Sequence, residues 1–161
     1  MTKKNSQKRI VGWREYVTLT ELNVENVVAK IDTGANLSSI HASDIRISSK
    51  EKIKYVTFKI KKNKNTLRKV TYKLHGFKKI KSSDGVVEKR PVIKTPIILD
   101  GIRKNIELTL TDRKTMDYTM LIGRKALGRR WMVNPAISFI TEKQENTTLV
   151  PFVRAVNTQW P

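Results

Sequence analysis

Short apolar stretches, each followed within a few residues by a turn signal, run along most of this chain. In several of them apolar and polar residues alternate, which is the period of a half-buried β-strand. Strands are predicted over residues 10–19, 24–31, 51–60, 67–74, 77–82, 86–94, 97–99, 105–111, 118–122 and 136–140. A helix is predicted only over the short stretch 123–129. The pattern therefore predicts an all-β fold whose closely spaced strands close into a small barrel.

The stretch over residues 51–60 alternates apolar residues with lysines. Tyr55 and Phe58 are among its apolar residues, but the alternation slips at Val56-Thr57. We expect a half-buried strand here, with a basic outer face and a bulge at the slip.

The apolar run over residues 24–31 ends in Asp32-Thr33-Gly34-Ala35. Such an ending places a carboxylate at the rim of the core, and the glycine lets the chain turn sharply without a Cβ clash. An Asp that only caps a turn would have the same local sequence. Asp32 is the candidate catalytic residue, and Thr33, Gly34 and Ala35 are the loop expected to orient it.

A second apolar segment ends in Leu121-Ile122-Gly123-Arg124 and leads into the short predicted helix. Between the two segments, Ser83-Asp84-Gly85 stands between extended runs and predicts the tip of a β-hairpin. A plain surface hairpin would show the same signal. In this order, the three features resemble those of retropepsin-like aspartic proteases. That resemblance implies a catalytic loop at Asp32, a flap at Ser83, Asp84 and Gly85, and a strand that braces the loop.

The resemblance covers most of the chain, from residue 9 to residue 138. It is carried further by residues 9–17, 38–42, 88–93 and 108–113. The chain is identified as a member of a bacterial and archaeal retropepsin-like family labelled "ATP-dependent zinc protease". Members are often encoded near, or linked to, ATP-grasp ligases of the RimK type, which add glutamate to proteins. The resemblance implies a retropepsin-like closed barrel.

Three parts of the chain are expected. A disordered basic arm is predicted over residues 1–8, the retropepsin-like domain over 9–141, and a C-terminal tail over 142–161 that contacts a partner subunit. The chain has 161 residues, which suffices for one domain with a core.

The Asp-Thr-Gly motif occurs once in the chain. Aspartic-protease chemistry requires two carboxylates about 3 Å apart that share one proton. The second carboxylate must therefore come from another copy of the chain. We expect a two-fold homodimer that works as an aspartic endopeptidase, with Asp32 of each subunit at the axis.

The formal net charge is +19, from 33 Lys and Arg residues against 14 Asp and Glu residues. Such a charge attracts polyanions, either nucleic acid or acidic peptide, and part of it is a solvated surface. No aromatic-rich RNA-binding signature occurs, and the resemblance favours an acidic or glutamylated protein substrate. Arg14 and Arg90 are candidates for binding its carboxylates, with a structural role as the alternative.

Several classes of site are excluded or disfavoured. The absence of cysteine excludes disulfides, thiolate metal sites and a cysteine nucleophile. The chain has two histidines, His41 and His75, where a catalytic zinc site needs about three ligands. Asp32, His41 and another carboxylate are the one zinc set we considered, and we expect neither a metal nor ATP as cofactor. No apolar run approaches the roughly 20 residues of a membrane span, and the N-terminus lacks a secretory signal, so we expect a cytoplasmic protein.

A non-enzymatic function is the alternative. The same barrel and charge suit a binding or adaptor protein for a RimK-type ligase, a ribosomal protein or nucleic acid. Asn36 stands where retroviral enzymes have an Asp that pairs with the helix Arg, so we expect Arg124 to have a different partner. A pair of carboxylates that cleaves peptide would decide for the peptidase.

Overall fold

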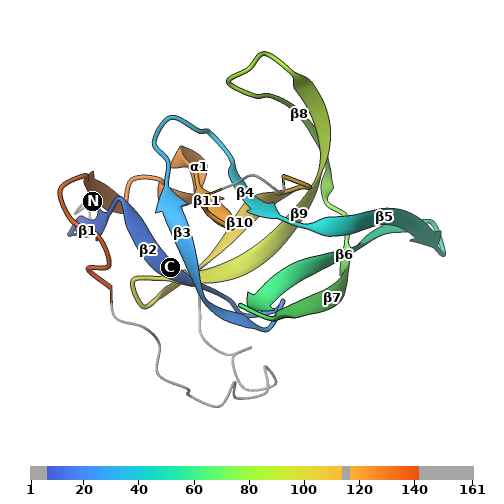
Figure 1. Cartoon of the computed structure of the whole chain (residues 1–161), viewed down its shortest axis with the longest axis horizontal. Helices are drawn as coiled ribbons and strands as arrows, with labels where there is room; N and C mark the ends of the chain where they lie inside the picture. The colour runs from blue at the N-terminus through green and yellow to red at the C-terminus, as the bar shows by residue number, and fades with distance from the viewer. Residues whose placement is uncertain (1–6, 114–116, 142–161) are drawn as a thin grey trace, which may run out of the picture.

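The computed structural model describes residues 7–113 and 117–141, which form a β-structure with one short helix (Figure 1). The elements, in chain order, are β1 (Arg9–Gly12), β2 (Arg14–Leu19), β3 (Val24–Ile31), β4 (Ser38–His41), β5 (Ser43–Lys50), β6 (Ile53–Asn63), β7 (Thr66–Lys73), β8 (Gly76–Lys81), β9 (Val87–Leu99), β10 (Ile102–Thr111), β11 (Met120–Ile122), α1 (Arg124–Leu127) and β12 (Trp131–Asn134). The expected C-terminal tail and residues 1–6 of the expected basic arm lie outside the described residues. In the described part of the chain, no helix is long and apolar enough to span a membrane.

Six strands form a closed barrel. Their order is β10-β4-β11-β3-β2-β9, and β9 pairs back onto β10 in antiparallel register. Buried apolar side chains from all six strands, such as Leu19, Ile40 and Leu108, form one contiguous core. Closure gives each of these strands a neighbour on both sides, so their backbone groups pair within the barrel. The all-β closed barrel predicted from the sequence is confirmed.

A three-stranded sheet, β5-β6-β7, packs beside the barrel. Val56, Phe58 and Ile60 of β6 point into the same core, whereas Tyr55 and Thr57 are only partly buried. The predicted bulge at Val56-Thr57 is wrong, because β6 pairs without interruption there on both sides. The actual alternation places Val56, rather than Tyr55, on the buried face.

The predicted strand over residues 10–19 is broken in two. β1 pairs with β12 in parallel, and β2 continues into the barrel. A Cβ on Gly12 would lie 2.4 Å from the carbonyl oxygen of Ile137, and the Trp13 amide donates to that same oxygen. The chain therefore bends where another segment crosses it, which the apolar pattern does not reveal.

The predicted strand over residues 136–140 does not form. The last strand is β12, which ends at Asn134, and within the segment that follows it Ile140 and Thr141 bond to the buried side chain of Glu15. The Glu15 carboxylate accepts hydrogen bonds from the amides of Gly12, Ile140 and Thr141 and from the Thr141 hydroxyl. A strand at β5 was not predicted, because most of its residues are polar and exposed.

The hairpin of β8 and β9 projects from the barrel beyond the other strands (Figure 1). β9 continues from this projection into the barrel wall as a single strand of 13 residues. The predicted hairpin around Ser83-Asp84-Gly85 is therefore confirmed as a structure. Its base is fixed in the barrel and its tip lies outside it.

Replacement of Glu15 by Gln should destabilise the fold. An amide offers one acceptor oxygen where the carboxylate offers two, so at least one buried amide or hydroxyl donor loses its partner. The expected loss in the free energy of unfolding is about 1–3 kcal/mol, measured by urea titration. Glu51→Gln, in the exposed turn before β6, serves as the control. Equal stability of the two variants would contradict the bracing role of Glu15.

Candidate active site

Asp32 follows directly on β3, and its loop is ordered by backbone hydrogen bonds. The Asp32 amide donates to the carbonyl oxygen of Ile122 at 2.8 Å, which extends the parallel pairing of β3 with β11 by one residue. The Gly34 amide donates to Oδ1 of Asp32 at 3.0 Å, and the Ala35 amide donates to its carbonyl oxygen at 3.2 Å. The Asp32 carboxylate is half-buried. One of its oxygens is thus oriented by the loop.

Gly123 lies against the far side of this loop. A Cβ at Gly123 would lie 2.7 Å from backbone atoms of Leu37, which no ordinary side chain tolerates. Its amide donates to the Ser38 hydroxyl at 3.0 Å, and the next amide, of Arg124, donates to the Ala35 carbonyl oxygen. Leu121 and Ile122 form most of β11, which pairs with both β3 and β4. The predicted brace therefore has the expected position.

Arg124 has a backbone partner. Its Nη1 donates to the carbonyl oxygen of Thr33 at 2.8 Å. Asn36 stands where retroviral enzymes have an Asp, and its backbone carbonyl oxygen accepts a hydrogen bond from the Lys125 amide at 3.0 Å. The arginine thus holds the exposed Thr33 end of the loop through a backbone oxygen, and no described residue forms an ion pair with it.

The tip of the β8–β9 hairpin is a tight turn. Gly85 has φ +85°, and its amide donates to the carbonyl oxygen of Ser82. The Ser82 hydroxyl donates to Asp84 and, together with the Val86 amide, lowers the pKa of the Asp84 carboxyl. Val86 and Val87 are about 60% exposed, so the tip presents apolar surface to the outside.

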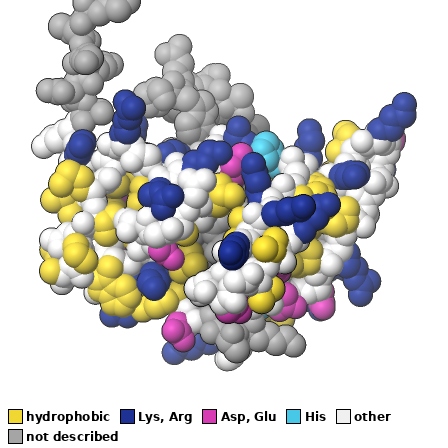
Figure 2. Space-filling view, turned by 90° about the horizontal axis from the view of Figure 1, so that it is seen from above, with side chains coloured by type: hydrophobic (Ala, Val, Ile, Leu, Met, Phe, Trp, Pro, Cys, Tyr) yellow, Lys and Arg dark blue, Asp and Glu magenta, His cyan; other side chains and the backbone are white. Residues whose placement is uncertain are grey.

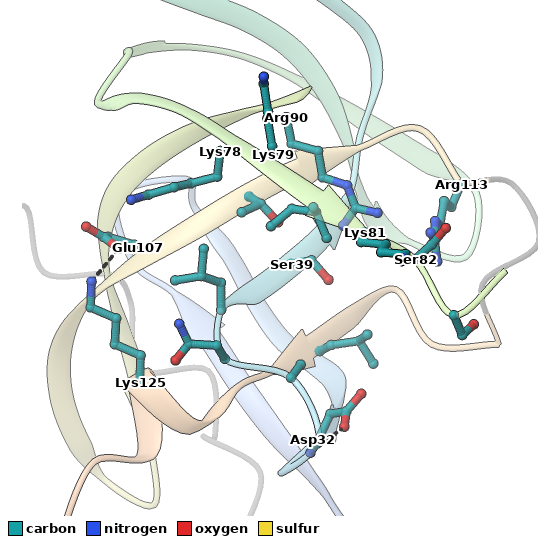
Figure 3. Close-up of a pocket in the computed structure, with 18 residues that line it drawn as sticks. Asp32, Ser39, Lys78, Lys79, Lys81, Ser82, Arg90, Glu107, Arg113 and Lys125 are labelled. Atoms are coloured by element: carbon teal, nitrogen blue, oxygen red, sulfur yellow. Dashed lines mark hydrogen bonds and ion pairs between the residues drawn. The ribbon is translucent and has the colours of Figure 1, made fainter. Parts of the chain in front are cut away.

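A cleft of about 670 Å³ lies between the Asp32 loop and this hairpin (Figure 3). Ser83, Gly34 and Ala35 are among its lining residues, and Leu121 lies in its floor. Its basic residues are Lys78, Lys79, Lys81, Arg90, Arg113 and Lys125. Two acids, Asp32 and Glu107, line it as well. The cleft is therefore strongly electropositive around a single loop carboxylate.

The basic wall of the cleft was not predicted from the sequence. The sequence feature that could have indicated it is the run Lys78-Lys79-Ile80-Lys81 directly before the hairpin tip. Figure 2 shows that Lys and Arg side chains are spread over the face seen from above, with fewer Asp and Glu side chains among them.

Glu107 is engaged by two basic side chains. Its carboxylate lies 2.6 Å from the Lys125 ammonium and 3.3 Å from His75 Nε2. The hydrogen bond from Lys125 lowers the pKa of Glu107 from its ordinary value of 4.5, and His75 adds to this effect. In Figure 3, Glu107 and Lys125 lie on the side of the cleft away from Asp32. Glu107 therefore connects α1 with the base of the projecting hairpin.

The structure brings Arg90 into the cleft and leaves Arg14 outside its lining. The side chain of Arg90 is 7% exposed, and its Nε lies 2.8 Å from Glu88. Arg14 stacks on the rings of Trp13 and Phe139. Arg90 thus has a fixed position at the cleft, whereas Arg14 packs against aromatic side chains.

The described residues show no group of three His, Asp or Glu side chains placed to hold a metal ion. His41 Nδ1 accepts the Arg113 amide at 3.1 Å and contributes no ligand to a set with Asp32. The Asp32, His41 and carboxylate set considered for zinc is therefore not assembled among the described residues.

A protein-family model described as the retropepsin-like aspartic endopeptidase RimB matches residues 10–144. The chain belongs to this RimB-like family. The crystal structure of a Legionella pneumophila protein of unknown function (DUF785) shares the fold, with a TM-score of 0.71 and 31% identity over 84% of this chain and all of that one. Membership in the RimB-like family confirms the predicted retropepsin-like fold and supports a hydrolase of the aspartic endopeptidase class.

Curated relatives of the RimB-like chain are named probable alpha-L-glutamate ligases. One from Shewanella halifaxensis is 37% identical over 145 residues, which are 88% of this chain and 32% of the relative. Another from Desulfotalea psychrophila is 34% identical over 133 residues, or 81% of this chain and 29% of the relative. The chain spans about a third of the length of these relatives.

Removal of the Glu107 charge should weaken the pH dependence of stability. The folded-state pKa of Glu107 is lowered, so its ion pair stabilises the fold above the ordinary pKa of 4.5 and ceases to do so as pH falls through the folded value. Glu107→Gln should therefore have a lower free energy of unfolding at neutral pH and lose less of it on acidification. Urea titrations at both pH values measure this difference.

Lys125→Met should reproduce that behaviour, because it removes the same ion pair from the other side. Lys52→Met, in an exposed turn, is the control for the loss of a positive charge. An unchanged pH dependence in Glu107→Gln would show that the pair does not contribute.

Proposed function

We propose that this protein is an aspartic-type peptidase that acts as a homodimer on acidic or glutamylated protein. The observation that carries the proposal is the position of Asp32. Its carboxylate lies in a cleft whose walls hold six basic side chains, so these cations attract a negatively charged peptide into the cleft that contains Asp32.

The chemistry requires a second copy of Asp32. Two carboxylates within about 3 Å cannot both ionise, so they share one proton. The ionised carboxylate takes a proton from a water molecule, whose oxygen attacks the carbonyl carbon of the peptide. The protonated carboxyl gives its proton to the carbonyl oxygen. When the tetrahedral intermediate breaks down, the carboxyl that took the proton of water gives it to the amide nitrogen, and the other carboxylate takes a proton from a hydroxyl of the intermediate. The C–N bond is cleaved, the amine leaves, and the pair again shares one proton.

The backbone contacts of the loop suit this role. The Gly34 amide holds one oxygen of Asp32, and Arg124 and Gly123 hold the rest of the loop against β4. The fixed geometry limits the motion of the carboxylate, as proton sharing across a two-fold axis requires.

The β8–β9 hairpin is proposed as a flap. Its tip at Ser83, Asp84 and Gly85 lies at the edge of the cleft, and Lys78, Lys79 and Lys81 are on the arm that faces it. Closure of this arm over a bound peptide would exclude water and bring these cations near its carboxylates.

Arg90 is proposed to bind a substrate carboxylate. Glu88 occupies its Nε, which leaves the terminal nitrogens of the guanidinium for a bidentate contact. Nucleic acid is the less favoured partner of this cleft, and acidic peptide is consistent with the names of the relatives.

The relatives named glutamate ligases suggest the source of the substrate. We propose that the protein works with an ATP-grasp ligase of this kind and removes residues that the ligase adds. The rest of each relative, about two thirds of its length, has no counterpart in this chain.

A binding or adaptor function remains the second candidate. It is favoured by the single Asp32 in the described part of the cleft, since Glu107 is engaged by Lys125 and His75. A cleft of this charge would hold an acidic partner without any hydrolysis.

Asp32→Asn should abolish cleavage of a glutamate-tailed peptide while the dimer persists. An amide cannot share the proton, so the loss should exceed about a thousandfold, which corresponds to the removal of an essential general base. Peptide cleavage followed by mass spectrometry, together with sedimentation analysis, measures both properties. Asp112→Asn, at an exposed residue outside the lining of the cleft, is the control. Full activity of Asp32→Asn would reject the peptidase, and a strictly monomeric active protein would reject the shared dyad.

Arg90→Lys should raise KM for an acidic peptide about tenfold and leave kcat nearly unchanged. Lysine keeps the charge and loses the planar pair of donors, so the binding of a carboxylate is weakened at a fixed position. Arg46→Lys, on the exposed strand β5, controls for the exchange. A fall in kcat with an unchanged KM would contradict a binding role for Arg90.

A further inference from the structure

A separate recess, of about 400 Å³, opens next to the cleft that contains Asp32. It lies between the end of β4 and the tip of the β6–β7 hairpin, and its basic residues are Lys61, Lys64 and Arg113. Arg113 lines the cleft as well as this recess, so the two hollows adjoin. We call it the hairpin recess.

Strand β4 leads from the cleft into the hairpin recess. Ser39 lines the cleft and His41 lines the recess. Residues two apart on a strand lie on the same face and about 7 Å from each other. A bound peptide in extended conformation has nearly the same rise, so about two of its residues cover this step.

Hydrogen-bond donors predominate in the hairpin recess. His41 accepts the Arg113 amide through Nδ1, so its neutral ring carries the proton on Nε2 and offers a donor there. The Asn63 side-chain oxygen accepts the Asn65 amide at 3.0 Å, and its NH₂ group is a donor. No Asp or Glu is among the lining residues in the described part of the chain. Together with the three cations, these donors suit a ligand that carries several carboxylate oxygens.

A bulge in β6 shapes this wall. Lys61 pairs with Leu67 and Asn63 pairs with Thr66, so Lys62 is an extra residue between them. Bulges redirect the side chains around them and are frequent beside functional sites. Lys61 and Asn63 line the recess, whereas the exposed Lys62 does not.

We propose that the hairpin recess is a second binding site for the acidic chain whose scissile part occupies the cleft. The proposal rests on the acidic substrate of the proposed function and adds that affinity depends on the length of the acidic chain. A chain long enough to reach both hollows binds the second one in an intramolecular step, at a high effective concentration. A shorter chain gains nothing from the recess.

The lining of the two hollows favours polypeptide over single-stranded nucleic acid. Proteins that bind single strands stack the bases on aromatic side chains. Neither the cleft nor the hairpin recess has a Phe, Tyr or Trp among its described lining residues.

The test compares two double variants with equal loss of charge. Lys61→Gln with Lys64→Gln removes the two lysines of the recess, and Lys50→Gln with Lys52→Gln removes two exposed cations outside its lining. Both are made in the Asp32→Asn background, so that no peptide is consumed. Fluorescence anisotropy then measures the affinity for labelled oligoglutamates of two and about ten residues; the two residues of the short peptide are about 3 Å apart, less than the step of about 7 Å, whereas the long peptide extends over about 33 Å.

The recess variant should bind the long peptide about tenfold more weakly than its parent and the short peptide with unchanged affinity. The control pair should weaken both peptides by the same small factor, because it changes only the general field of the protein. Equal losses for the long and short peptides, or an equal length effect in the control pair, would overturn the proposal. An oligonucleotide of the same charge that binds more tightly than the long peptide, and loses more in the recess variant, would assign the site to nucleic acid instead.

The same measurements distinguish failure of the peptidase proposal from failure of the recess proposal. Wild-type protein that cleaves no glutamate peptide, but whose Asp32→Asn form shows the length effect, would retain the recess as a binding site and lose the enzyme. Cleavage with no length effect in binding would retain the enzyme and reject the recess.

Discussion

The geometry of the candidate site depends on the insertion of β11 between β3 and β4. β11 pairs in parallel with β3 and antiparallel with β4, so both ends of the Asp32 loop are attached to one strand. The contact is so close that only glycine fits at position 123, where a Cβ would meet the backbone of Leu37. A loop that would otherwise be a mobile connection between strands is thereby held in one conformation, with its carboxylate at the rim of the core.

Many of the basic side chains line the cleft that contains Asp32. A net charge of +19 alone predicts attraction of any polyanion. The fold places six of the Lys and Arg side chains along one cleft. Glu107 lines the same cleft and pairs with Lys125 and His75. Arg90, with Glu88 beside it, is held rigidly at the same place.

An aspartic-type peptidase needs two carboxylates that share one proton. The described cleft presents Asp32 without a second loop acid, so symmetry has to complete the dyad in a peptidase. The β8–β9 hairpin and the exposed valines near its tip extend outward from the barrel. The binding hypothesis and the enzymatic hypothesis therefore differ in assembly and share the same cleft.

Local signals along the chain were sufficient to predict the barrel, the turn after the strand that ends at Asp32, the hairpin tip and the short helix after Gly123, whereas the bracing strand was predicted from the family resemblance. Each local signal depends on neighbouring residues: an apolar run that ends in an acid, a turn dipeptide or a glycine before a short helix. The interruption at Trp13, the missing strand over residues 136–140 and the network around Glu15 could not be predicted in this way, because their partners are more than a hundred residues apart. For the same reason, the sequence indicated a basic protein, but not that Lys78, Arg113 and Lys125 line the same cleft as Asp32. Local periodicity determines which residues form strands, whereas closure of the barrel decides which distant side chains become neighbours.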